Sequence, residues 1–161
     1  MTVVELLAHT RLRLAGAPRE ALGIDAQQRR ILGIARAPRI VADGSVWHLG
    51  ALLVGDEEVY ATGEVIRSAP EVRRGYAAES QRQRAARAAA AFRGGFPEGT
   101  TVHVGWRLLD PAALDRGEAS PPLAVVDAVP SIRWSAAGAY MPLERYLDER
   151  IALLLDPAPG A

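Results

Sequence analysis

The sequence predicts an α+β protein with a mainly antiparallel sheet, and three observations lead to that fold class. The first is a central hairpin: residues 46–54 are apolar on both alternating faces, and residues 59–67 return after the polar reversal at 55–58. The second is a long alanine-rich helix, residues 76–92, that can pack on the sheet through small side chains. The third is a helical pattern at each end of the chain.

The N-terminal pattern begins with Thr2 and Glu5, which have the spacing of a capping box. We therefore expect a first helix that ends near Leu14. Pro18 suits a first helical position and Gly23 a helix stop, and residues 25–28 form a second capping box. The first forty residues are thus predicted to be mainly short helices, and residues 39–42 can add a brief strand before the hairpin.

The second half of the chain predicts further strands and the last helix. Residues 100–109 alternate apolar and polar side chains, which indicates a strand with one face in the core. A short helix follows from Asp110, and residues 123–129 and 132–134 read as strands separated at 130–131. From Pro142 an apolar stripe predicts an amphipathic C-terminal helix. We expect a single domain over residues 1–155 and a flexible tail over 156–161.

Composition excludes several classes of function. Basic and acidic residues number nineteen each, so no net field attracts nucleic acid or an anionic membrane. Every basic residue is arginine; without lysine there is no Schiff-base or phosphate-loop lysine, and without cysteine there is no thiolate chemistry. No apolar stretch is long enough to span a membrane. We expect a soluble, cytoplasmic protein that uses no cofactor and no metal.

Two histidines and a glutamate are the candidate catalytic residues. His48 and His103 lie on predicted strands, and Glu64 lies on the return strand of the hairpin. A hairpin turn of two or four residues places His48 opposite Val65 and Glu64 on the other face, whereas a three-residue turn places Glu64 opposite Gly50, on the His48 side. The competing interpretation is structural: a tethered histidine in a central strand, a partly exposed His103 and a glutamate paired with arginine.

Arginines near the start of the long helix are candidate ligand-binding residues, because guanidinium groups can hold a carboxylate or phosphate by forked hydrogen bonds. The candidates are Arg67, Arg73, Arg74 and Arg107, with Arg82, Arg84 and Arg87 beside them on the helix. A solvated helix face explains the same residues. The three tryptophans, Trp47, Trp106 and Trp134, each lie on a predicted strand and are expected in the core.

Four strings, at residues 47–53, 60–64, 92–98 and 142–150, together resemble a group of short uncharacterised actinobacterial proteins, some of which are labelled glutaminase. Serine-dependent glutaminases use a Ser-x-x-Lys pair and the amidotransferase type uses a cysteine. This chain has neither lysine nor cysteine, so the resemblance assigns no catalytic residue.

The sequence leaves three functions open. The first is a non-catalytic domain that associates with itself, as a homodimer for example, or with another protein through the hairpin edge or the last helix. The second is a small hydrolase or lyase that uses His48, His103 and Glu64. The third is an anion-binding module that uses the arginines between residues 67 and 87.

Overall fold

The computed structural model describes residues 1–26, 32–34, 36–73 and 75–160. Its helices and mainly antiparallel strands confirm the predicted α+β class. The chain forms two compact units from interleaved segments: unit 1 comprises residues 1–19, 46–62 and 107–161, and unit 2 comprises residues 20–45 and 63–106. Whether the two units make up the single domain predicted over 1–155, with a tail over 156–161, stays a prediction.

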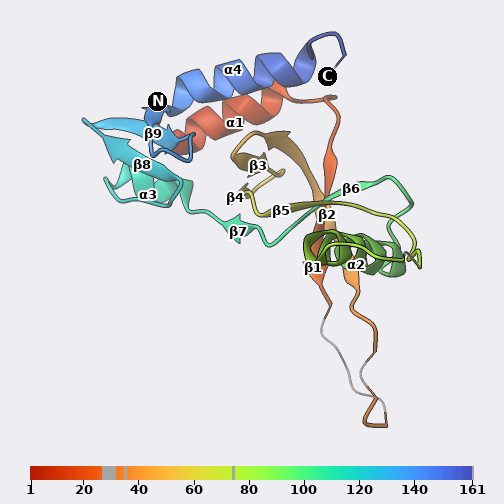
Figure 1. Ribbon diagram of the computed structural model, residues 1–161. Coiled ribbons are helices and arrows are strands. Elements are labelled where there is room, and N and C mark those ends of the chain that lie inside the picture. Colours follow the sequence, from red (N-terminus) through yellow and green to blue (C-terminus); the bar gives the residue numbers. More distant parts are fainter. Residues whose placement is uncertain (27–31, 35, 74, 161) are drawn as a thin grey trace. The chain divides into compact units, whose positions relative to one another are not determined.

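Unit 1 combines helices with small antiparallel sheets (Figure 1). Its helices are α1 (Val3–Arg13), α3 (Pro111–Asp115) and α4 (Leu143–Leu155). One sheet contains the last part of β2 (Ile40–Leu49), then β3 (Leu52–Val54), β4 (Val59–Ala61) and β7 (Arg107–Leu108) in that order. The other has the order β10 (Tyr140–Pro142), β9 (Val129–Arg133), β8 (Leu123–Val126).

The terminal helices form as their sequences predict. At the start of α1, the Thr2 hydroxyl accepts from the Glu5 N–H at 3.1 Å and the Glu5 carboxylate accepts from the Thr2 N–H at 2.7 Å, which confirms the capping box. That backbone hydrogen bond holds the pKa of Glu5 below its ordinary value. On α4, Leu143, Leu147 and Ile151 are buried at helical spacing, as predicted. The two helices contact each other within unit 1 (Figure 1).

The predicted hairpin contains an additional turn that was not expected. Residues 46–54 are not one strand, because the chain reverses at Gly50, whose φ of 64° favours glycine, and β2 pairs with β3. Tyr146 of α4 fixes this reversal: its hydroxyl donates to the Leu49 carbonyl at 3.0 Å and accepts from the Ala51 N–H at 2.7 Å. The reversal predicted at 55–58 is confirmed, since the Gly55 N–H donates to the Glu58 carbonyl at 2.8 Å.

Unit 2 contains a sheet of order β5-β6-β1-β2, covered by α2 (Glu79–Arg93) (Figure 1). Its strands are β1 (Glu20–Asp25), the first part of β2, β5 (Glu64–Arg67) and β6 (Thr101–Val104). β1 runs parallel to β6, and β5 runs antiparallel to β6. The core is made by Ile40, Ile66, Ala90, Ala91, Phe96, Val102 and Val104.

The long helix packs on this sheet through small residues, as predicted, although over different positions. Its buried residues are Ala89, Ala90 and Ala91, whereas Phe92 is partly exposed. At the end of α2 the chain approaches so closely that a Cβ atom on Gly94 would overlap the carbonyl oxygen of Ile40. Alanine and glycine therefore set the distance between helix and sheet.

Other sequence predictions were wrong. Residues 20–25 form strand β1 rather than a short helix, because parallel pairing with β6 outweighs the local helix signals. The second capping box runs into residues 27–31, which lie outside the described residues. The strand predicted over 100–109 is interrupted at Gly105, whose φ is 64°. The turn between β8 and β9 falls at residues 127–128 rather than 130–131.

The tryptophans divide between core and surface. Trp47 is buried in unit 1 and its indole N–H donates to the Ala17 carbonyl at 3.2 Å. Trp106 is half-buried in unit 2 and donates to the Gly23 carbonyl at 3.0 Å. Trp134 is 51% exposed, so its predicted place in the core was wrong. Among the described residues, no helix is both long enough and apolar enough to cross a membrane.

Candidate functional site

His103 is a buried member of β6 rather than a partly exposed one. Its exposed fraction is 0%, and its Nε2 atom lies 2.5 Å from a carboxylate oxygen of Glu20 on β1. Parallel pairing places Leu22 beside His103, so Glu20, two residues earlier, lies on the same face of the sheet. The imidazole is therefore held by a carboxylate that sequence reasoning did not identify, because β1 was not predicted as a strand.

Glu64 does not share that face. Val65 is the residue opposite His103, and Glu64 pairs with Val104, so the Glu64 side chain lies on the other side of the sheet. His48 belongs to unit 1, where it pairs with Leu53 and its Nε2 atom lies 3.0 Å from the Gly50 carbonyl oxygen. Neither predicted hairpin register occurs. Within unit 2, the catalytic candidates His103 and Glu64 do not converge.

Glu64 instead belongs to an ion-pair cluster on the α2 side of the sheet. The Arg87 guanidinium donates to both carboxylate oxygens of Asp25, at 2.6 and 3.2 Å, and to Glu64 at 3.2 Å. These contacts, the hydrogen bonds with Asp25 first, raise the pKa of Arg87. The cluster ties α2 to β1 and β5, and it largely neutralises the charge of Arg87.

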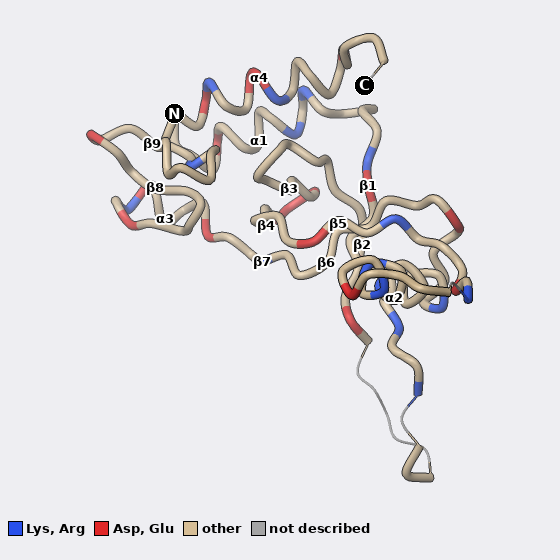
Figure 2. Tube along the Cα trace, viewed as in Figure 1, with Lys and Arg blue, Asp and Glu red and all other residues tan. Residues whose placement is uncertain are grey.

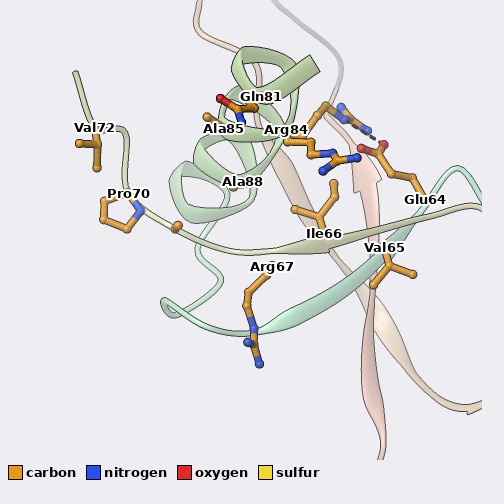
Figure 3. A pocket seen from close by; sticks show the side chains of 12 residues that line it. Glu64, Val65, Ile66, Arg67, Pro70, Val72, Gln81, Arg84, Ala85 and Ala88 are labelled. Carbon is orange, nitrogen blue, oxygen red and sulfur yellow. Dashed lines mark hydrogen bonds and ion pairs between the residues drawn. The ribbon is translucent and has the colours of Figure 1, made fainter. Parts of the chain in front are cut away.

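Arg67 and Arg73, the two predicted ligands described in unit 2, line different hollows. Arg107 belongs to unit 1, where it donates to the Pro121 carbonyl, and Arg74 lies outside the described residues. Arg67 points away from α2 (Figure 3), and Arg73 lines a separate hollow of about 280 Å³ beside the first half of α2. On α2 itself, where basic positions gather (Figure 2), Arg82 is paired with Glu79 at 2.8 Å.

Unit 2 contains a groove between β5 and α2. Its volume is about 480 Å³. β5 and the extended segment after it form one wall, and one face of α2 forms the other (Figure 3). The lining residues are Glu64, Val65, Ile66, Arg67, Ala69, Pro70, Val72, Gln81, Arg84, Ala85, Arg87 and Ala88.

The strand that borders this groove lies at the edge of its sheet. Ser68 donates its N–H to the Thr100 carbonyl at 2.9 Å, so its backbone is directed toward the β6 side. Backbone groups alternate in direction along an antiparallel strand, and those of Val65 and Arg67 are therefore directed away from β6. Ala69, the next residue with the outward direction, donates to the Ala88 carbonyl of α2 at 3.2 Å. Among the described strands β5 is the last of its sheet, so the outward backbone groups of Val65 and Arg67 lie on the side of the strand that α2 meets at Ala69.

The two ends of the groove differ in character. Arg84 extends from α2 toward the end where Glu64 lies, whereas Pro70 and Val72 stand at the other end (Figure 3). Ile66 points into the groove between them, and Val65 points to the opposite face of the sheet with 54% of its surface exposed. The groove therefore offers backbone hydrogen-bonding groups, apolar surface and a guanidinium group.

Comparison of the chain with protein-family models, with curated proteins and with solved structures gives no match. Sequence reasoning named Arg67 and Arg84 but missed the groove itself. The signal that could have found it is the break at Gly63, which separates β4 from β5 and frees β5 to become an edge strand.

Proposed function

We propose that unit 2 is a protein-association module that binds an extended segment of a partner chain as an additional strand along β5. The observation that carries this proposal is the groove of about 480 Å³ between the open edge of β5 and α2. Edge strands that face a groove are used for this purpose because the main chain supplies affinity and the flanking pockets supply specificity. No catalytic group enters the proposal.

The dimensions support a short bound segment. β5 contains four residues, Glu64–Arg67, which span roughly 13 Å at about 3.3 Å per residue. Val65 and Arg67 each offer one outward N–H and one outward carbonyl, enough to pair with a segment of about five residues. The apolar end at Pro70 and Val72 can accept a side chain of the same segment.

The edge itself is also consistent with a binding role. Proteins commonly protect edge strands with bulges, prolines or inward-pointing charges, because an open edge pairs with other chains. β5 carries Val65 and Ile66 at its centre and no proline between Glu64 and Arg67. A strand of this composition, bordered by a helix that limits access to one extended segment, favours selective pairing over aggregation.

The test is a proline substitution that removes one outward donor. Val65→Pro deletes an N–H that points into the groove and leaves the hydrogen bonds to β6 intact, since those belong to Glu64 and Ile66. Val65→Thr is the matched control, because it keeps the N–H and the β-branched shape. Both variants are compared with the wild type against a displayed library of eight-residue peptides, and selected peptides are measured by NMR titration.

We expect peptides selected on the wild type to bind Val65→Thr and to lose at least about tenfold in affinity for Val65→Pro, the effect of a lost main-chain pairing. Peptides that bind Val65→Pro unchanged would contradict strand addition. A dimer in analytical ultracentrifugation that Val65→Pro dissociates would instead make a second copy of this chain the occupant of the edge, and the partner-chain proposal would be wrong.

A further inference from the structure

Arg84 gives the groove a cation that no described residue neutralises. Its side chain is exposed and lines the groove. Among the described residues, no carboxylate lies within ion-pair distance of Arg84, whereas Arg87, one turn further along α2, is bound by Asp25 and Glu64. The two arginines therefore have different roles. Arg87 holds α2 against β1 and β5, and Arg84 is available to a ligand.

The other charges along the groove do not compensate Arg84. The lining contains Arg67, Arg84 and Arg87 against the single carboxylate of Glu64, which already accepts from Arg87. In the neighbouring hollow, which shares Val72, Gln81 and Ala85 with the groove, Arg73 adds a further positive charge beside Glu71. Glu79 offsets Arg82 on the first half of α2, and Asp25 and Glu64 offset Arg87. Arg84 is thus the arginine of this part of α2 that no described carboxylate pairs.

Strand geometry determines which side chains of a bound segment would reach Arg84. In a segment paired with β5, alternate side chains lie on the two faces of the extended sheet. One set lies on the α2 side, with Ile66 and Arg84, and the other lies beside Val65 on the opposite face (Figure 3). Carboxylates in the first set would meet a guanidinium, and apolar side chains in the second set would cover Val65.

We infer that the segment accepted by this groove is acidic, with carboxylates alternating with apolar side chains so that one carboxylate pairs with Arg84. The inference rests on the proposed function and names its ligand class. Guanidinium binds carboxylate by two parallel hydrogen bonds, which strengthens the pair and fixes its register. The carboxylate can belong to a side chain or to a chain terminus, and the experiment below separates these sources.

The experiment uses three peptides of one length and the full protein. The first is acetylated Thr-Glu-Val-Glu-Val-Glu-Thr with an amidated end, the second replaces each glutamate with glutamine, and the third is the glutamine peptide with a free terminal carboxylate. Dissociation constants are measured by fluorescence anisotropy for the wild type, for Arg84→Gln and for Arg82→Gln. Arg82 is the matched control because it lies on the same helix and is already paired with Glu79.

We expect the glutamate peptide to bind the wild type about tenfold more tightly than the glutamine peptide, a difference typical of a charge-assisted pair. Arg84→Gln should remove that difference and Arg82→Gln should keep it. The difference should also shrink as the salt concentration rises from about 0.05 to 0.5 M, because salt screens exposed charges. If the free terminal carboxylate restores affinity to the glutamine peptide, the recognised group is a chain terminus and the alternating acidic pattern is wrong.

Failure of this inference and failure of the proposed function have different outcomes. If the glutamate and glutamine peptides bind equally, and both lose affinity for Val65→Pro, the groove adds a strand without preferring carboxylates. If none of the peptides binds at millimolar concentration while the wild type remains folded, strand addition at β5 is itself wrong. A glutamate preference that Arg84→Gln leaves unchanged would assign the carboxylate to a different arginine and overturn the role of Arg84.

Discussion

Unit 1 and unit 2 bury their apolar side chains in different ways. The core of unit 1 is built from large side chains of helices and strands, including Trp47, Leu52, Tyr146 and Leu147. In unit 2 the helix contributes alanines to a smaller cluster, and residues 79–86 of α2 remain exposed. Unit 1 therefore covers its helices and strands with large apolar side chains, whereas unit 2 leaves the first half of α2 exposed. The candidate groove lies beside that exposed part of α2.

The largest expected effect is on the helix contact of unit 2. Gly94→Ala would place a methyl group on the backbone of Ile40, which cannot move without breaking the sheet, so α2 should fail to dock. NMR would show the Trp106 indole N–H signal shifted or lost while that of Trp47 in unit 1 persists. Gly75→Ala is the control, because Gly75 has no described atom within 4 Å of the added methyl group. A native spectrum for Gly94→Ala would contradict the close helix contact.

A large effect is also expected in the core of unit 1. Leu52→Ala removes a fully buried side chain and should lower the free energy of unfolding by about 2–5 kcal/mol. Urea unfolding followed by tryptophan fluorescence measures the loss. Leu153→Ala, on an exposed position of α4, should change stability by less than about 0.5 kcal/mol. Equal losses for the two variants would show that unit 1 does not depend on its core in the way described.

A smaller effect is expected where α4 fixes the turn at Gly50. Tyr146→Phe deletes the hydroxyl that joins the Leu49 carbonyl to the Ala51 N–H, and should cost about 1–3 kcal/mol. Faster hydrogen exchange at Ala51 would locate the damage. If the variant were as stable as the wild type, the turn would be maintained by Gly50 and the β2–β3 pairing alone.

The smallest expected effect is a loss of stability of unit 1 at low pH. In unit 1 the pKa of Asp56 is lowered, chiefly by its hydrogen bond with Arg19, and the pKa of Asp110 is lowered by Arg116. A carboxylate with a lowered folded-state pKa stabilises the protein above its ordinary pKa of 3.8, and this contribution is lost as the pH falls through the lowered value. Below about pH 4 the stabilisation of unit 1 by these two carboxylates should therefore be lost, and the Trp47 signal should report that loss.

Asp56→Asn provides the control for this prediction. It should reduce the acid sensitivity of unit 1 slightly and leave unit 2 unchanged, because exposed pairs contribute little to stability. Thermal unfolding between pH 3 and 6, followed through the two indole signals, measures both responses. An unchanged acid response of the Trp47 signal in Asp56→Asn would contradict a contribution of the Arg19–Asp56 pair to the stability of unit 1.

The sequence was sufficient to predict elements whose stability is local. The capping box at Thr2 and the apolar stripe of α4 depend on residues three or four apart, so their patterns are readable without knowledge of the fold. The reversal at Gly55 was predictable for the same reason. The amphipathic character of these segments also led to the correct fold class.

Elements fixed by distant partners were not predictable. β1 becomes a strand because β6, about eighty residues later, pairs with it, and that pairing also buries His103 beside Glu20. The turn at Gly50 lies inside an apolar run, where glycine is equally compatible with a continuous strand. The groove was not predictable for the same reason. It requires β5 as an edge strand and a helix α2 that Arg87 holds against Asp25 of β1 and Glu64 of β5.

The interleaving of the two units along the chain has a consequence for synthesis. The ribosome completes every segment of unit 2 when Trp106 emerges, whereas unit 1 still lacks β7, α3, α4 and the three strands between these two helices. Residues 1–19 therefore complete their core only after residues 107–160 have been made, and the candidate groove can form while the leucines of α1 remain uncovered. Translation pausing after residue 106 would lengthen the interval in which unit 2 is complete while unit 1 has not yet folded.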